Sequence, residues 1–211
     1  MIIVLFGKPG AGKGTQAPLL AAALGVPTLA TGDELRAAIK AGTKLGLEAK
    51  AYMDRGDLVP DDVILGIIKQ ALSEPRTANG VLLDGVVRTV PQAEGLAKVA
   101  AELGKKVDAV LAFGIDDDEI VRRLASRTVC ESCQTPYTGR EPGTACDKCG
   151  GKLVRRKDDE PEAIRNRLAV YDRQTRPVLD WYEKNGTRVA EIDAVGPVQD
   201  VTSRALGALA T

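Results

Sequence analysis

The chain has 211 residues, 44% of them hydrophobic and 27% charged, a balance that excludes disordered and fibrous proteins and leaves room for one domain with a small insert. Its 29 basic residues equal its 29 acidic ones and only 3% of the residues are aromatic, which argues against a nucleic-acid-binding protein. Histidine is absent, so Ser-His and Cys-His nucleophile pairs and histidine metal ligands are excluded.

Apolar runs typical of buried parallel strands alternate along the chain with stretches of helical periodicity. The predicted strands span residues 2–6, 26–30, 81–83, 107–113 and 188–192. The predicted helices span residues 12–24, 60–72, 91–103, 117–127, 160–183 and 198–209. This alternation predicts an α/β domain built on a parallel sheet.

The longest predicted helix, 160–183, carries its own boundary signals. Asp159 and Glu162 have the spacing of a capping box at its start. Pro177 should kink the helix, because proline lacks the N–H that the helix needs, and Asn185-Gly186 should end it.

No apolar run approaches the ~18 residues of a membrane span, and residues 2–6 are too few for the apolar part of a signal peptide. We therefore expect a cytoplasmic chain without a membrane partner. Its four cysteines should then be reduced thiols.

The first predicted strand leads directly into a glycine-rich loop and then a helix. Residues 7–15 read Gly-Lys-Pro-Gly-Ala-Gly-Lys-Gly-Thr, a Gly-x4-Gly-Lys phosphate loop with glycine at the usual Ser or Thr position. Glycines let backbone amides face phosphate oxygens, and the helix N-terminus adds positive charge. The alternative is a glycine-rich turn without a ligand. We expect a nucleoside triphosphate to bind Gly10, Ala11, Gly12, Lys13, Gly14 and Thr15.

Asp84 follows the apolar run 81–83, at the edge where open α/β sheets bind ligands. A carboxylate there is placed to orient Mg²⁺. The alternative is an aspartate that caps a helix or turn.

The segment 128–157 has almost no large apolar residues and holds all four cysteines, Cys130, Cys133, Cys146 and Cys149. Two Cys-x2-Cys pairs separated by 12 residues form a four-thiolate pattern, which predicts a structural Zn²⁺ that supplies the folding energy of this segment. Iron also binds such sites. Disulfides, free thiols and a redox-active pair are the alternatives.

With these motifs the chain resembles, along essentially its whole length, the adenylate kinases, in the bacterial form with a metal-containing lid. The resemblance is carried by residues 7–15, 31–33 with Arg36, 53–60, 82–85 with 88–89 and 91–93, and 156–159 with Arg165 and Arg167. It implies a P-loop three-layer α/β fold with a five-stranded parallel sheet, a small helical monophosphate-binding insert and a zinc-binding lid. The expected boundaries are 1–29, 60–126 and 158–211 for the core, 30–59 for the insert and 127–157 for the lid.

The resemblance also implies roles for individual residues. AMP would contact Thr31, Arg36, Val59, Gly85, Arg88, Gln92, Arg156 and Arg167. ATP would contact the phosphate loop together with Arg123, Arg127 and Gly196. Catalysis would rest on Lys13, Arg88, Arg127, Arg156 and Arg167. Phosphoryl transfer needs positioning and charge neutralisation, so the absence of histidine is no obstacle.

One motif departs from the family pattern. Adenylate kinases usually read Asp-Gly-Phe-Pro-Arg with a cis bond before proline, whereas this chain reads Asp84-Gly85-Val86-Val87-Arg88. A cis bond without proline costs ~2.5–4 kcal/mol, so we expect a trans bond. Either isomer can shift Arg88 against the AMP phosphate, which makes AMP affinity and turnover the features most exposed to this change.

The resemblance implies the reaction MgATP + AMP ⇌ 2 ADP, in a monomer that binds ATP, AMP and ADP and no nucleic acid. Three alternatives stay open at this point. The chain can be a kinase for another nucleoside monophosphate, or a nucleotide-binding protein whose acceptor site is impaired by Val86-Val87. The third alternative is a zinc-ribbon nucleic-acid-binding protein with an NTPase core, which the basic run 155–157 motivates.

Overall fold

The computed structural model describes residues 1–210, of Leu45 the backbone only. A five-stranded sheet forms the centre, in the order β2-β3-β1-β4-β8, and every pairing is parallel. The strands are β1 (Ile2–Gly7), β2 (Thr28–Ala30), β3 (Val81–Asp84), β4 (Val107–Gly114) and β8 (Arg188–Asp193). All five predicted strands and the predicted fold class are confirmed.

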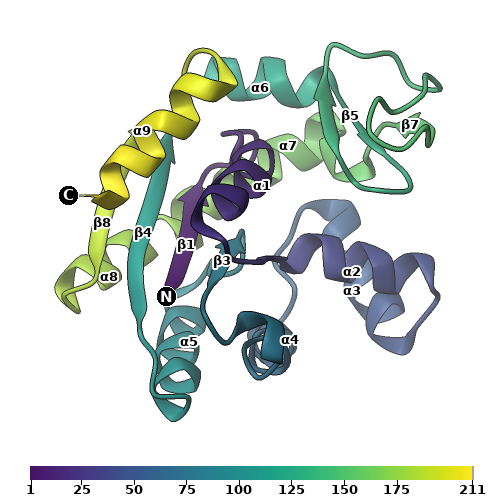
Figure 1. The fold of residues 1–211 in the computed structure, drawn as a ribbon. Helices are drawn as coiled ribbons and strands as arrows, with labels where there is room; N and C mark the ends of the chain where they lie inside the picture. The colour runs from purple at the N-terminus through teal and green to yellow at the C-terminus, as the bar shows by residue number, and fades with distance from the viewer. Residues whose placement is uncertain (211) are drawn as a thin grey trace.

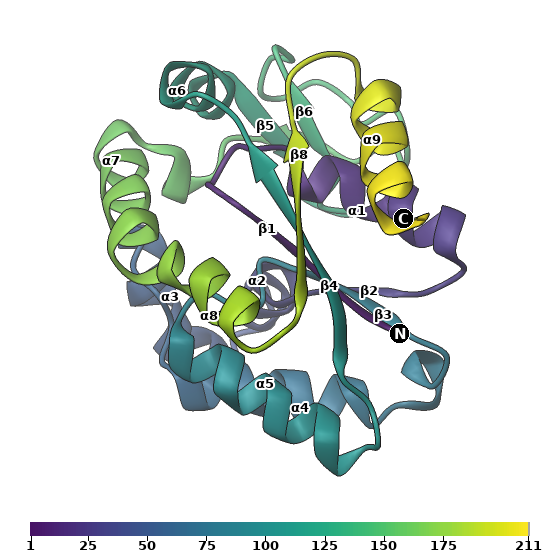
Figure 2. The same ribbon diagram turned by 90° about the vertical axis from the view of Figure 1, so that its left-hand side faces the viewer.

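Helices cover both faces of this sheet (Figures 1 and 2). Alternation along β1 explains the two layers. Ile2, Val4 and Phe6 pack into one apolar cluster with the helices at residues 61–72, 90–102 and 177–184, and Ile3 and Leu5 pack into a second cluster with those at 13–24 and 198–210. The helix bounds are α1 (Lys13–Leu24), α4 (Asp61–Leu72), α5 (Val90–Glu102), α6 (Asp117–Ala125), α7 (Pro161–Val170), α8 (Pro177–Lys184) and α9 (Val198–Ala210). None of the described helices is long and apolar enough to span a membrane.

The prediction of one helix over 160–183 is only partly right. A π-helical turn, η3 (Tyr171–Thr175), separates α7 from α8, and the amide of Arg176 donates to the Tyr171 carbonyl at 2.8 Å. Proline lacks an amide hydrogen and its ring crowds the preceding turn, so a wider turn ahead of Pro177 relieves both problems. Asn185 and Gly186 end α8 as predicted.

The predicted capping box at Asp159 is wrong. Glu160 is the N-cap residue of α7, and its side chain makes no capping bond. The Asp159 carboxylate accepts instead from Arg127 and Arg167. Charge-assisted bonds to two guanidinium groups are stronger than one bond to a helix amide, which explains why the ion pairs prevail.

Two smaller units project from the sheet on the same side of the molecule (Figure 1). The helices α2 (Thr31–Lys40) and α3 (Lys44–Arg55) form the first unit. The strands β5 (Arg127–Cys130), β6 (Pro136–Thr138) and β7 (Leu153–Val154) form a three-stranded antiparallel sheet in the second. These strands were not predicted, because strands this short show no alternation. Short 3-10 turns, η1 (Pro75–Thr77) and η2 (Lys157–Asp159), complete the described elements.

A buried hydroxyl gives a first testable prediction. Tyr182 of α8 is 1% exposed, and no described group forms a hydrogen bond with its hydroxyl. Because an unsatisfied buried donor is costly, Tyr182→Phe should raise the free energy of unfolding by ~1 kcal/mol. Urea unfolding followed by Trp181 fluorescence measures this. Tyr52→Phe, at a side chain on the surface of α3, is the matched control and should change nothing. A destabilised Tyr182→Phe variant would contradict the prediction.

Candidate functional site

The phosphate loop between β1 and α1 has the backbone shape that its glycines allow. Gly10 and Gly12 have φ values of 87° and 93°, in the left-handed region that favours glycine. A Cβ at Gly10 would also lie 3.0 Å from Leu124 of α6, so this glycine is required for close packing as well. The Lys13 ammonium lies inside the loop and donates to the carbonyl oxygens of Gly7 (2.7 Å) and Lys8 (3.0 Å).

The electrostatics around Lys13 are those of a buried cation. Burial lowers the pKa of Lys13 to about 8, although the Asp84 carboxylate opposes the shift. Burial also raises the pKa of Asp84, against the charge of Lys13. An Asp84 oxygen lies 3.5 Å from the position that a Cβ on Gly14 would take, so the carboxylate borders the start of α1. Thr89, not Asp84, caps the helix that follows, which disfavours the capping alternative for Asp84.

A large pocket opens over this loop and contains every residue that the sequence predicts for ATP. Its lining includes Gly10, Ala11, Gly12, Lys13, Gly14, Thr15, Arg123, Arg127 and Gly196, together with Asp84. Arg36, Arg88, Arg156 and Arg167 line it as well, so the pocket presents many cations to a ligand. Such a lining suits a polyanion.

The loop at residues 193–196 contributes Ala194 and Gly196 to the lining of the pocket. Arg204 of α9 donates to the carbonyls of Asp193 (2.7 Å) and Val195 (2.8 Å), and Arg123 of α6 donates to that of Ala194 (3.3 Å). Gly196 in this loop has a φ of 111°. Two arginines thus hold the backbone that the sequence predicts to face adenine. The part played by Arg204 was not predicted, since nothing in the sequence near it signals which carbonyls it reaches.

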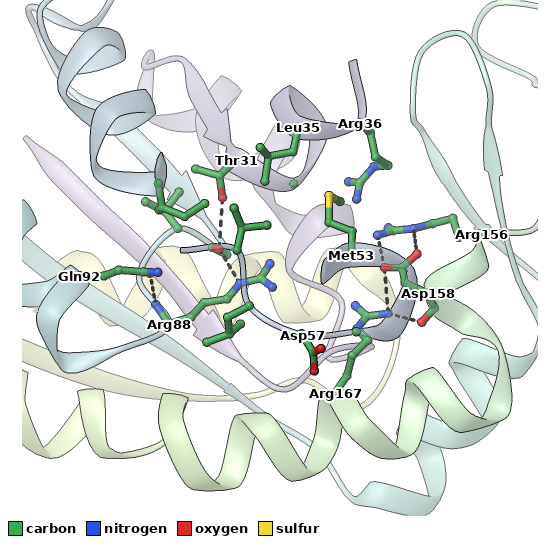
Figure 3. Close-up of a pocket in the computed structure, with 17 residues that line it drawn as sticks. Thr31, Leu35, Arg36, Met53, Asp57, Arg88, Gln92, Arg156, Asp158 and Arg167 are labelled. Carbon is green, nitrogen blue, oxygen red and sulfur yellow. Dashed lines mark hydrogen bonds and ion pairs between the residues drawn. The ribbon is translucent and has the colours of Figure 1, made fainter. Parts of the chain in front are cut away.

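A second pocket lies next to the first and contains every residue predicted for AMP (Figure 3). Its cationic end holds Arg36, Arg88, Arg156 and Arg167, and Thr31, Gly85 and Gln92 also line it. Its apolar side is formed by Leu35, Met53, Val59, Ile64 and Val86. The predicted AMP contacts did not include Leu35, Met53 and Ile64, which lie on three separate helices, although Met53 begins the 53–60 motif. A pocket with one cationic and one apolar part fits a nucleoside monophosphate.

The loop after β3 shapes this second pocket. The described residues contain no cis peptide bond, so Val86–Val87 is trans as expected. Arg88 donates its Nε–H to the Gly85 carbonyl (2.8 Å), and its backbone amide donates to Oε1 of Gln92 (2.8 Å). The Gln92 amide in turn donates to Asp61 (2.7 Å). Gln92 is therefore held by the protein at 1% exposure, and its predicted contact with adenine remains a prediction.

Where the two pockets meet, three arginines pair with two carboxylates, and Figure 3 shows two of these arginines, Arg156 and Arg167, beside Asp158. Arg127 binds Asp159, and Arg156 binds Asp158 through two bonds of 2.9 and 2.7 Å. Arg167 reaches both carboxylates, at 3.2 Å to Asp158 and 3.0 Å to Asp159. All five side chains are at most 16% exposed. We name these five residues the arginine–aspartate cluster.

Two members of the cluster, Asp158 and Arg167, keep their charges despite burial. Burial opposes ionisation of Asp158, but the charges of Arg156 and Arg167 outweigh it and hold the pKa of that carboxyl below its ordinary value. Burial lowers the pKa of Arg167 to about 10, so this guanidinium is charged at neutral pH. The structure pairs both Asp158 and Asp159 with arginines.

The four cysteines gather as a metal site requires. Their Sγ atoms lie within 4.8 Å of one another, with 3.5 Å between Cys130 and Cys149 and 3.6 Å between Cys133 and Cys146. Sulfur atoms at Zn–S distances of ~2.3 Å on a tetrahedron are ~3.8 Å apart, so the four thiolates fit Zn²⁺. All four are free cysteines, which contradicts the disulfide alternative. A Cβ at Gly151 would lie 2.9 Å from the Cys130 sulfur, so glycine is needed there.

A phosphate loop that faces a second, nucleotide-shaped pocket across paired arginines defines a nucleotide phosphotransferase. Comparisons with known proteins specify the family. A sequence model of the adenylate kinase family matches residues 5–187. The chain is 62% identical to an adenylate kinase of Gemmatimonas aurantiaca over 99% of both chains. It is 47% identical to one of Methanocella arvoryzae, over 96% of this chain and 95% of the relative. The chain belongs to the adenylate kinase family.

Proposed function

We propose that this chain transfers the γ-phosphoryl group of MgATP reversibly to AMP and so forms two ADP. The observation that carries the proposal is the meeting of two pockets at the arginine–aspartate cluster. One pocket holds a phosphate loop, and the other combines a cationic end with an apolar side. Family membership supports the same reaction.

The donor would lie over the phosphate loop. The loop amides and Lys13 would bind the β- and γ-phosphates, Arg123 would stack on adenine, and the backbone at Gly196 would face the base edge. Asp84 borders Lys13 and Gly14 and is placed to orient Mg²⁺. Magnesium, when bound with ATP, neutralises charge on the transferred group.

The acceptor would lie in the second pocket. Arg36 and Arg88 would bind the AMP phosphate, with Thr31, Val59, Gly85 and Gln92 around the nucleoside. The phosphate oxygen of AMP is already a nucleophile at neutral pH, so the residues need only align it. Arg88, Arg127, Arg156 and Arg167 together with Lys13 would neutralise the transferring phosphoryl group, and arginine forks suit its oxygens.

We further propose that residues 30–59 and 127–157 are the two units that close over the substrates, and that residues 1–29, 60–126 and 158–211 are the core. Closure would exclude water and so protect ATP from hydrolysis. Contacts between the two closing units support this proposal. The Lys40 ammonium lies 3.4 Å from the Glu131 carbonyl, and the Lys157 ammonium lies 3.8 Å from the Asp54 carboxylate. Zn²⁺ would serve structure alone, because cysteines fill all four positions.

Initial rates with MgATP and saturating AMP, CMP, UMP or GMP test the function. We expect fast ADP formation with AMP alone. Comparable rates with CMP or UMP would keep the mechanism and change the acceptor. Binding of ATP without turnover of any acceptor would overturn the kinase proposal and favour a nucleotide-binding protein impaired at Val86-Val87. If the chain binds neither RNA nor DNA at any salt concentration, the nucleic-acid-binding alternative is excluded.

We also propose that the chain is a monomer and that it is located in the cytoplasm. Balanced charge and the family resemblance support the monomer, and four reduced cysteines support the cytoplasm. Light scattering of the metal-loaded protein and fractionation of the source cells test these two points.

The buried Lys13 predicts a proton uptake that accompanies ATP binding. Since its pKa lies at about 8 without ligand, about half of the molecules carry a neutral Lys13 at pH 8. Bound phosphates favour the charged form of Lys13. When MgATP binds, the protein should therefore take up about half a proton per molecule at pH 8 and about a tenth of a proton at pH 7. Calorimetry in buffers of different ionisation enthalpy measures this. Lys13→Met should remove the uptake, and an uptake of zero at pH 8 in the unmodified chain would contradict the prediction.

A further inference from the structure

Tyr137 of β6 lies between the four-cysteine site and the phosphate-loop pocket. Its hydroxyl oxygen is 3.2 Å from the Cys146 sulfur and 3.1 Å from the backbone nitrogen of Asp147, which donates to it. The same residue lines the pocket over the phosphate loop. Its ring lies against the Arg140 guanidinium, 5.4 Å from the ring centre. Among the described residues, no other one forms a side-chain hydrogen bond with a cysteine sulfur and lines this pocket as well.

The direction of the hydroxyl bond follows from the donors present. A tyrosine hydroxyl has one hydrogen, and its oxygen already accepts from the amide of Asp147. A metal-bound thiolate has no hydrogen, so between Tyr137 and Cys146 only the tyrosine can donate. The Tyr137 hydroxyl thus donates to the Cys146 sulfur and accepts from the Asp147 amide, and these two bonds together hold it in place. Outer bonds of this kind orient metal ligands and affect how tightly the metal is held.

We propose that the Tyr137 hydroxyl is an outer-shell donor to the metal-bound Cys146 thiolate, and that this bond couples metal retention to ATP binding. Tyr137 is thus a positioning residue. The metal site holds the hydroxyl, and the hydroxyl holds the ring and the β6 backbone in the wall of the ATP pocket. The assignment of ATP to that pocket rests on the proposed function.

The pairing of β5 with β6 also links Tyr137 to the arginine–aspartate cluster. Tyr137 pairs with Thr128 of β5, and the neighbouring pair joins Arg127 to Thr138. β5 has Arg127 of the arginine–aspartate cluster at one end and Cys130 of the metal site at the other. A ligand that stabilises this wall should stabilise the metal site, and the reverse holds by linkage, because a coupling free energy acts equally in both directions.

Thr135 provides a matched control. Its hydroxyl oxygen lies 3.1 Å from the Cys133 sulfur, so it is a second outer-shell hydroxyl of the same metal site. Unlike Tyr137, it is not among the residues that line the pocket over the phosphate loop. Thr135→Val and Tyr137→Phe each remove one such hydroxyl and keep the rest of the side chain nearly unchanged in size. Only Tyr137→Phe should break the connection to ATP.

The test measures the release of Zn²⁺ from the metal-loaded protein to an excess of a colorimetric zinc chelator, with equal magnesium in all samples, with and without ATP. Without ATP, we expect release about 10-fold faster from Tyr137→Phe and from Thr135→Val than from the unmodified chain. ATP should slow release from the unmodified chain and from Thr135→Val, and should leave release from Tyr137→Phe unchanged. KM for ATP should rise in Tyr137→Phe alone, with KM for AMP unchanged.

Two outcomes would overturn the proposal: release from Tyr137→Phe at the unmodified rate, or equal slowing by ATP in all three proteins. Melting of each metal-loaded protein, followed by circular dichroism, checks that the variants are folded. Release without nucleotide involves no phosphoryl transfer, so it stays informative if the kinase reaction is absent. Direct titration of the unmodified chain with MgATP separates a failure of coupling from a failure of ATP to bind.

Discussion

Replacing Arg167 by methionine should lower kcat for ADP formation by ~1000-fold, the low end of what an arginine contributes to phosphoryl transfer. Arg167 is at most 13% exposed and reaches both carboxylates of the arginine–aspartate cluster. Like Arg36, Arg88 and Arg156 it lines both pockets, so it is placed to neutralise a group that moves between them. A steady-state assay of kcat and of KM for each nucleotide measures the effect.

Arg165 is the matched control for Arg167. It lies on the same helix, α7, with an exposed side chain, and lines neither nucleotide pocket. Arg165→Met should therefore keep kcat within about twofold, as expected for surface substitutions away from special contacts. Arg167→Lys should recover only part of the rate, because an ammonium lacks the guanidinium fork. Equal kcat values for Arg167→Met and Arg165→Met would refute the assigned role.

Removal of the metal should unfold the unit that contains β5, β6 and β7. Among its described residues the apolar cluster consists of Cys130, Cys146 and Leu153, with Cys133 and Tyr137 at its edge. A cluster this small contributes little, whereas structural Zn²⁺ contributes ~10–16 kcal/mol in small metal-folded units. Because Arg127 begins this unit, its displacement by even 1 Å should lower kcat by ~100-fold.

Limited trypsin digestion with mass spectrometry, before and after a chelator, measures the unfolding. New cuts should appear at Lys148 and Lys152, while cuts in α2 and α3 should not change and serve as the internal control. Added Zn²⁺ should restore both the digestion pattern and the rate, and metal analysis of the purified chain decides between zinc and iron. An unchanged digestion pattern in demonstrably metal-free protein would show that the unit folds by other means.

The central sheet was predictable because its signal is local. The runs at 2–6 and 107–113 are apolar at nearly every position, as expected for strands buried on both faces, and all five strands lie within two residues of their predicted ends. The π turn before Pro177 was not predictable in form, since a proline signals that a helix must deviate but not how. The three short strands of the cysteine-rich unit depend on pairing across residues 127–154, which no local pattern encodes.

The candidate site also contains residues that were predictable from the sequence and residues that were not. Lys13 was predicted from a contiguous motif whose spacing has a chemical meaning and Arg88 from the family resemblance, and both line the pockets expected for nucleotides. Side chains that support them from distant segments were not predicted, because their role exists only in three dimensions. Arg204 and Asp61 are examples. Arg204 is bonded to loop carbonyls 11 and 9 residues away, and Asp61 to Gln92 of α5, 31 residues away. In the sequence nothing distinguishes either one from an exposed surface charge.

The arginine–aspartate cluster has a consequence for selectivity among anions. Asp158 and Asp159 pair with Arg156 and Arg167, so any anion that approaches these arginines must compete with the two tethered carboxylates. Inorganic phosphate must break these arginine–aspartate pairs and forms few other contacts with the protein. A nucleotide must break them too, but its base and its other phosphates form further contacts with the pocket and the phosphate loop. Inorganic phosphate should accordingly inhibit weakly, and neutralising the carboxylate by Asp158→Asn should increase that inhibition in competition assays. Such assays measure how far the paired carboxylates keep the proposed transfer centre available in a phosphate-rich solution.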